Sequence, residues 1–218
     1  MRDRLFRDAV SIGVATGVYA ISFGVLSVSA GFSVAQTCVM SLVAFTGASQ
    51  FTFVAAMGAG GGVAAALPPA ILLAARNGIY ALSLGSVLRR GRVRRAVDAH
   101  LVIDESTAMA LAQPDPAARR RGFELTALAI FVCWNVGTLA GALAGGVLGD
   151  PRDLGMDAIF PAVFLALLVP QLRTAGAGRA AIAGAIIAVA LLPVAPAGVP
   201  VMASVLAALP LIARRRSA

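Results

Sequence analysis

The chain has 218 residues, of which 59% are hydrophobic and only 13% charged, and its mean hydropathy is +0.88. Soluble domains are closer to about 45–50% apolar and about 25% charged. No charged residue occurs between Asp8 and Arg76, a stretch several times longer than one membrane crossing needs. This composition excludes a soluble domain and predicts an all-α, polytopic membrane protein with a single transmembrane domain over residues 1–218.

The formal net charge is +8, and all 18 basic residues are Arg. These arginines cluster at the ends of apolar segments, and only 6% of the residues are aromatic, so a nucleic-acid surface is not expected. The two cysteines, Cys38 and Cys133, lie inside apolar segments without the spacing of a metal or redox site. The sequence contains no nucleotide motif and no nucleophile–base pair, so we expect neither an enzyme nor a bound metal or cofactor.

The first half, residues 1–88, begins with a basic head and a spanning helix expected over Ala9 to Ala30. The following apolar stretch, Val34 to Leu67, is too long for one helix, and the small polar residues from Thr46 to Gln50 predict a break in it. Pro68-Pro69 predicts a second break, because proline removes a backbone donor and clashes with the preceding turn. The next span is expected over Ala70 to Leu88.

Positive loops stay on the cytoplasmic side of a membrane. The basic head and the loop 89–121, which holds eight arginines, are therefore both expected inside, with an even number of crossings between them. The 34–67 region then contributes either no crossing, as a re-entrant hairpin, or two crossings, as a pair of short helices. Both alternatives place broken backbone near the middle of the membrane, where it is tolerated only against protein or a wet cavity.

The second half, residues 122–218, contains an outward span expected over Phe123 to Leu148 and an outer loop over Gly149 to Asp157. Three shorter apolar segments follow, and the last leads to Arg214, Arg215 and Arg216, which places the C-terminus inside as well. The shorter segments are expected over 158–172, 180–192 and 201–213. Two halves built from broken and short helices favour an inverted internal repeat, as in many transporters.

The predicted break carries the first group of candidate substrate-binding residues, Thr46, Gly47, Ser49 and Gln50. A hydroxyl or amide in hydrocarbon without a partner costs several kcal/mol, so these groups must face protein or a substrate. If the chain unwinds at Gly47, the free N–H groups of the following helix start would suit a carboxylate. The alternative is a hydrogen bond between helices with no ligand.

Arg76 is an arginine within an apolar segment, where it costs about 2.5–3.5 kcal/mol and indicates a functional site by default. It is a candidate for binding a substrate carboxylate or for pairing with a buried acid, and the alternative is that it reaches the membrane surface. Asn77 and Tyr80 lie beside it or one turn away. Asp104 and Glu105 are coupling or gating candidates that could neutralise Arg76, carry a proton or simply lie on a solvated helix face.

Two further positions in the second half are candidates. Asp157 stands at the mouth of an expected span as a gate, although capping a helix is the commoner use of Asp there. Asn135 is a polar residue among the glycines of the 123–148 span and is a candidate for lining the cavity, with packing as the default interpretation.

Several of these segments resemble motifs of the AzlC family, the large subunit of branched-chain amino-acid permeases. Phe45 to Phe51 resembles the family signature, and Arg76 to Leu84 is similar to its Asn-x-Arg-His-x-x-Tyr-Gly segment. Ile103 to Ser106 resembles its Asp-Glu motif, and the segments that begin at Trp134 and Asp157 match in order. The family's His is Asn77 here, and its preceding Asn is Ala74.

The resemblance implies a subunit of a bacterial inner-membrane secondary transporter that exports branched-chain amino acids together with a small AzlD-like membrane subunit. The expected substrate site lies at the predicted break, with the aliphatic side chain among Phe45, Phe51 and neighbouring Leu or Val residues. A channel or a transporter for another small solute, and a scaffold that does not itself transport, are the alternatives.

Overall fold

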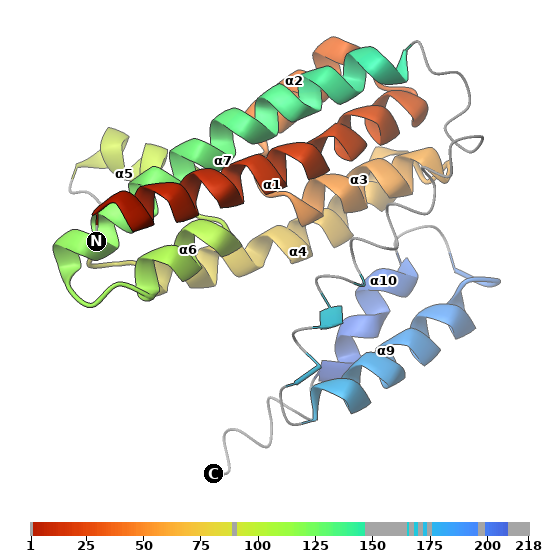
Figure 1. The fold of residues 1–218 in the computed structure, drawn as a ribbon. Helices are drawn as coiled ribbons and strands as arrows, with labels where there is room; N and C mark the ends of the chain where they lie inside the picture. The colour runs from red at the N-terminus through yellow and green to blue at the C-terminus, as the bar shows by residue number, and fades with distance from the viewer. Residues whose placement is uncertain are drawn as a thin grey trace.

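The computed structural model describes residues 2–88, 91–146, 165, 168–169, 172–173, 176–195 and 199–208. Within these residues every regular element is a helix, which confirms the predicted all-α class. Three helices are long and apolar enough to cross a membrane (Figure 1). They are α1 (Arg2–Ser29), α4 (Gly62–Ser83) and α7 (Pro116–Gly145).

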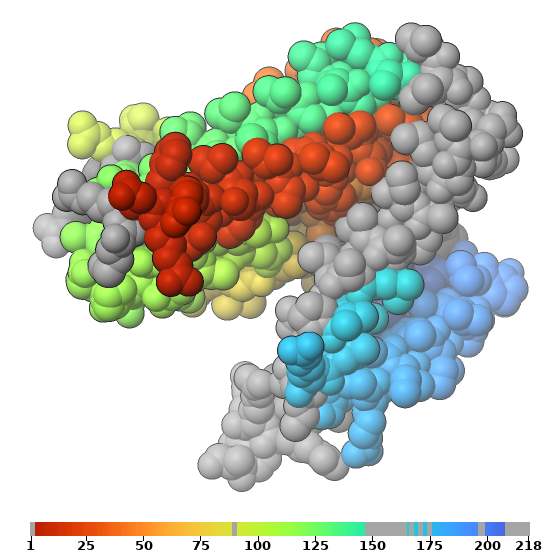
Figure 2. All heavy atoms as spheres, viewed as in Figure 1, coloured from red at the N-terminus to blue at the C-terminus, as the bar shows by residue number. Residues whose placement is uncertain are grey.

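Helices α1 and α7 are the closest-packed pair in the described structure, and they run parallel (Figures 1 and 2). Gly13 of α1 lies at Ala129 of α7, Gly17 lies at Cys133, and Gly145 lies at Val25, so contacts advance along both helices in the same direction. A Cβ at Gly17 would lie 2.8 Å from the carbonyl oxygen of Cys133. The glycines are therefore a packing face, as small residues are at many membrane-helix interfaces.

The outer faces of this pair carry large exposed apolar side chains at helical spacing. On α1 these are Val10, Val14, Val18 and Ile21, and on α7 they are Leu128, Val132, Val136, Leu139 and Leu143. Exposed apolar stripes of this length belong in lipid rather than in water, because in water they would form a large unfavourable patch. The composition predicts membrane spans, and the outward-facing apolar side chains of α1 and α7 agree with this prediction.

The region 34–67 contains a hairpin of two short helices, α2 (Val34–Val43) and α3 (Ala48–Gly58). The hairpin starts and ends at the same end of α1: Ser27 hydrogen-bonds Thr37 at 2.8 Å, and a Cβ at Gly58 would lie 3.3 Å from Cβ of Ala30. Its turn lies against the middle of α1 and α7 (Figure 1). The re-entrant alternative is therefore the one that the structure adopts.

The second break falls elsewhere than predicted. Pro68 and Pro69 lie inside α4, which begins at Gly62 and not at Ala70. The chain turns instead at Ala59–Gly61, where Gly60 has a φ of 79° that favours glycine. Two prolines in a membrane helix cost two backbone hydrogen bonds, whereas a break would free more backbone groups in lipid. The glycines at 58 and 60–62 therefore indicated the position of the break better than the two prolines did.

The loop 89–121 contains two short helices, α5 (Arg92–His100) and α6 (Asp104–Leu111), and the first turn of α7. They lie at the same end of the bundle as the N-terminus (Figure 1). Asp98, only 1% exposed, pairs with Arg120 of α7 at 2.9 Å, and Arg120 also donates to the carbonyl oxygen of Val87 at 2.6 Å. We call this the basic end; among its described arginines are Arg4, Arg94, Arg119 and Arg121.

The described C-terminal part is a compact helical group. Helix α9 (Ala177–Leu191) matches the span expected over 180–192 and packs on α10 (Val199–Ser204) and the 3₁₀ helix η3 (Val205–Ala208). Most of the segment predicted over 158–172, the outer loop and the end of the segment 201–213 lie outside the described residues. The inverted repeat stays a prediction.

The α1–α7 contact gives a stability test. A methyl group added by Gly141→Ala would lie 2.7 Å from the carbonyl carbon of Ile21, so one helix backbone must shift. Overpacking of this kind costs about 1–3 kcal/mol. We expect the purified variant to unfold at a lower temperature than the unsubstituted protein. Gly78→Ala on α4 is the control, because a Cβ there meets nothing within 4 Å; equal effects of the two changes would contradict the packing.

Candidate functional site

The turn of the hairpin, between Val43 and Ala48, is where polar backbone is exposed deep in the bundle. Gly47 has a φ of 64°, which reverses the chain direction so that α3 starts at Ala48. The first N–H groups of a helix have no partner within it. No hydrogen bond in the described part takes up the N–H groups of Ala48 and Ser49, so the positive end of α3 opens toward a cavity.

Gln50 holds this turn in place. Its side chain is 2% exposed; Oε1 accepts from the Gly47 N–H at 3.1 Å, and Nε2 donates to the Met40 carbonyl oxygen of α2 at 3.1 Å. The hydroxyls of Thr46 and Ser49 hydrogen-bond each other across the turn. Gln50 therefore has the structural role that the sequence left open as an alternative, and it does not line the polar cavity.

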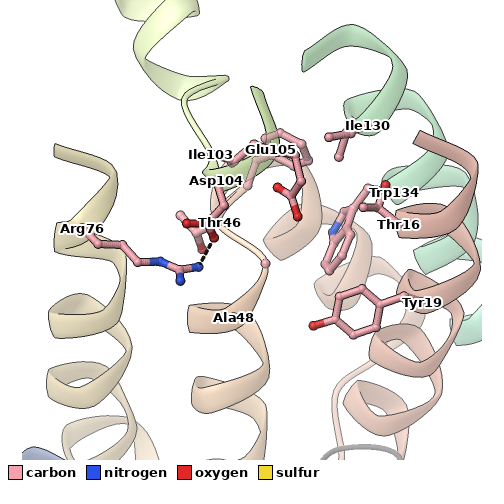
Figure 3. Close-up of a pocket in the computed structure, with 12 residues that line it drawn as sticks. Thr16, Tyr19, Thr46, Ala48, Arg76, Ile103, Asp104, Glu105, Ile130 and Trp134 are labelled. Carbon is pink, nitrogen blue, oxygen red and sulfur yellow. Dashed lines mark ion pairs between the residues drawn. The ribbon is translucent and has the colours of Figure 1, made fainter. Parts of the chain in front are cut away.

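The polar cavity at the start of α3 has a volume of about 40 Å³ and is walled by side chains from several helices (Figure 3). Its floor is the turn at Thr46, Gly47 and Ala48, and α1, α4, α6 and α7 supply the walls. The side chains that matter chemically are Tyr19, Arg76, Asp104, Glu105 and Trp134. Residues far apart in sequence thus meet at one helix N-terminus.

Arg76 of α4 and Asp104 of α6 form an ion pair across this cavity, with 2.5 Å between Nη2 and Oδ2 (Figure 3). Both side chains keep about a third of their exposure, at 31% and 35%. Pairing lowers the cost of holding an arginine within the membrane, and partial exposure keeps the pair accessible to a competing ion. The sequence analysis offered Asp104 and Glu105 as acids that could neutralise Arg76, and in the structure Asp104 does so.

Glu105 lies beside Asp104 but forms no ion pair with a basic residue in the described part. Its carboxyl group is partly buried, and burial raises its pKa, with a further increase from the charge of Asp104. Its own backbone N–H and the Arg76 charge act in the opposite direction. Glu105 thus presents a carboxyl group to the cavity, and in the described part of the chain this group has no cationic side chain bound to it.

Trp134 presents a further hydrogen-bond donor without a partner at this cavity. Its side chain is 3% exposed, and its indole N–H has no hydrogen-bond partner in the described structure. Figure 3 shows the indole nitrogen on the side of the ring that faces Glu105. A buried donor without a partner costs about 1–3 kcal/mol, so a polar group entering the cavity would find it ready.

Tyr19 forms the other aromatic wall. Its ring stacks on Phe51 at 5.0 Å and meets the edge of Trp134 at 5.3 Å. Phe51 is fully buried and packs in the core, so the expectation that it lines the aliphatic pocket was wrong. Phe45 does line the polar cavity.

A second cavity, of about 290 Å³, lies between the hairpin and α4. Its lining is almost entirely apolar, and it touches Ser49, Gln50 and Thr46 on the hairpin side. Thr46 also lines the polar cavity, so the two cavities lie on either side of one residue at the start of α3.

The remaining predicted residues are dispersed. Asn77 and Asn135 line neither cavity: each has a side-chain oxygen without a partner in the described part, and the amide of Asn135 donates to Phe131 O in its own helix at 2.8 Å. Tyr80 packs beside Leu84 and its hydroxyl interacts with Asp104. Asp157 lies outside the described residues. No group of His, Cys, Asp or Glu that could hold a metal occurs in the part of the chain that is described.

The candidate site residues chosen from the sequence include neither Tyr19 nor Trp134. The available signal was their rarity, since the chain has two Tyr and one Trp, and an amphipathic aromatic in the middle of an apolar span needs a polar partner.

The fold and the cavity define a polytopic helical membrane protein with a re-entrant hairpin that ends at a charged site. The chain belongs to the AzlC family, since the family model described as "AzlC protein" matches residues 11–148. This membership is consistent with a membrane transport role and confirms the resemblance seen in the motifs.

The similar proteins are also named as membrane proteins. An "Uncharacterized membrane protein" of Archaeoglobus fulgidus is 32% identical over 78% of this chain and 75% of its own length. "Inner membrane protein YgaZ" of Escherichia coli is 28% identical over 87% and 82%. An "Uncharacterized membrane protein" of Helicobacter pylori is 27% identical over 85% and 84%. No solved structure matches the chain significantly.

The role of Gln50 can be tested by Gln50→Leu, which keeps a side chain of similar size but leaves the Gly47 N–H without its partner; the Met40 carbonyl oxygen loses one of its two donors and keeps the Ala44 N–H. A buried donor without a partner costs about 1–3 kcal/mol, so thermal unfolding of the detergent-solubilised protein should occur at a lower temperature. Thr52→Val is the control, because that hydroxyl only donates to Ala48 O within its own helix. Unchanged stability of Gln50→Leu would show that the turn does not depend on this side chain.

Proposed function

We propose that the chain is the large subunit of a secondary transporter that exports aliphatic, branched-chain amino acids across the bacterial inner membrane. The observation that carries the proposal is the start of α3, where unpartnered backbone N–H groups, an accessible arginine and a lone carboxylate meet in one cavity. These are the groups that a zwitterion needs. The family membership supports transport as the activity.

In this proposal the substrate carboxylate binds at the N–H groups of Ala48 and Ser49. A helix N-terminus attracts an anion through both its dipole and its free donors. Arg76 adds a positive charge near the substrate carboxylate when it releases Asp104 and binds the substrate instead. The exchange is feasible because an ion pair that keeps about a third of its exposure is weakly held.

The substrate ammonium group would bind at Glu105, between the rings of Tyr19 and Trp134. A carboxylate supplies the opposite charge, and the aromatic faces attract a cation within about 6 Å of the ring centre. The carboxylate and the ammonium group of the solute would thus bind to groups from different helices, and either group alone would bind weakly.

The proposed assembly includes a small AzlD-like membrane subunit, and the proposed orientation places the basic end and both termini in the cytoplasm. The arginines of that end support the orientation through the rule that basic loops stay inside. With this orientation the hairpin enters the membrane from the outer face.

Arg76→Ala tests the site. We expect leucine and valine efflux from loaded cells that also contain the small subunit to fall about ten-fold or more, because a hydrogen bond to a charged group contributes about 1.5–3 kcal/mol. Undiminished efflux would remove Arg76 from the mechanism.

The double variant Arg76→Ala/Asp104→Ala separates binding from charge pairing. If Arg76 contacts the substrate, efflux stays low in the double variant. If Arg76 only neutralises Asp104, removal of both charges restores efflux, and the substrate role is wrong. Protein amounts in the membrane serve as the control for folding in both variants.

The orientation can be tested by single cysteines in a chain whose Cys38 and Cys133 are replaced by alanine. Ala59→Cys, at the exposed end of α3, should react with an impermeant maleimide added to intact cells. Val93→Cys on α5, which is 79% exposed, should react only after permeabilisation. The reverse pattern would invert the proposed topology.

A further inference from the structure

The polar cavity is too small for a whole branched-chain amino acid. It measures about 40 Å³, several times smaller than an apolar cavity of about 150 Å³ that binds benzene. Its space suits the charged groups of a solute, which have small volume and need donors and acceptors. The aliphatic chain must therefore lie somewhere else.

The larger cavity beside it has the size and chemistry for that chain. Its volume is about 290 Å³, and seven apolar side chains make up most of its wall: Met40, Ala44, Phe53, Leu67, Ala70, Ile71 and Ala74. The benzene comparison shows that such a space holds more than the four carbons of a leucine side chain. Burying those carbons stabilises the complex by about 0.8 kcal/mol for each CH₂ group.

The two cavities are adjacent along both elements that wall them. On the hairpin they share Thr46, with Ala48 facing one and Ser49 the other. On α4, Ala74 lines the apolar cavity and Arg76, two residues on, lines the polar one. A solute whose carboxylate sits at the start of α3 can therefore place its side chain past Thr46.

We propose that the apolar cavity between the hairpin and α4 is the subsite that receives the aliphatic side chain of the substrate and sets its permitted length. The inference rests on the proposed function and goes beyond it by assigning side-chain selectivity to residues outside the polar cavity. Small residues at 70 and 74 leave the space for branched chains, and Phe53 closes it on the hairpin side.

Filling the cavity should alter selectivity rather than activity as a whole. Ala74→Phe places a ring in the subsite, so leucine efflux should fall about ten-fold or more relative to alanine efflux. A difference of this size is expected because the loss of space for one methylene group already changes discrimination between substrates by about ten-fold or more. Ala75→Phe is the matched control, because Ala75 is exposed on the same helix and lines neither cavity. Equal loss of leucine and alanine efflux in Ala74→Phe, or no change in either, would overturn the subsite.

A photoreactive leucine with a diazirine in its side chain locates the subsite directly. Membranes that contain the full chain would be labelled with and without excess leucine, and the modified peptides mapped. Labelling at Met40, Phe53 or Ala74 that leucine suppresses is the expected result. Suppressible labelling confined to Phe45 or Ile130, which line the polar cavity, would overturn the subsite and leave the proposed function standing. Absence of any label that leucine suppresses would overturn both.

Discussion

The hydrogen bonds of Gln50 are the interaction on which the site depends. A chain that reverses inside a membrane leaves peptide groups that neither water nor lipid can satisfy. Gln50 takes up one donor at Gly47 and one acceptor at Met40, and so holds two short helices together at their tip. The two N–H groups that it does not take up, at Ala48 and Ser49, remain available to a solute. Some polar groups of this turn thus stabilise the hairpin, and the others are free to bind a solute.

The rigid pair α1–α7 gives this turn a fixed place. Glycines bring the two helix backbones together, and the hydroxyl contacts Ser27–Thr37 and Ser41–Thr138 fasten α2 to α1 and α7, respectively. Helices α4 and α6 supply the charges, Arg76 and Asp104, from outside this pair. The ion pair joins two side chains and uses no backbone group of the turn, so it can open without disturbing the N–H groups at the start of α3.

Much of this could be predicted from the sequence where a local signal decides the outcome. The polar residues from Thr46 to Gln50 predicted the break, and Arg76 stood out because a charge in lipid needs a reason. Pro68-Pro69 misled, because the cost of a proline in a helix was weighed without the greater cost of free backbone in lipid. The pairing of Arg76 with Asp104, the unpaired indole of Trp134 and the apolar cavity could not be derived, since each depends on which helices pack together. Asn77 was a candidate because it lies beside Arg76, and Asn135 because it is a polar residue among glycines, but neither lines either of the two cavities described above.

The central claim is that bare N–H groups at the start of α3 bind the carboxylate of a solute. Calorimetric titration of the purified assembly with leucine and with leucine amide tests it most directly, because the two ligands share the ammonium group and side chain and differ only in the carboxylate. We predict that leucine amide binds about ten-fold more weakly or worse, as expected when a charged hydrogen bond of about 1.5–3 kcal/mol is lost. Equal affinity for the two ligands would contradict the account.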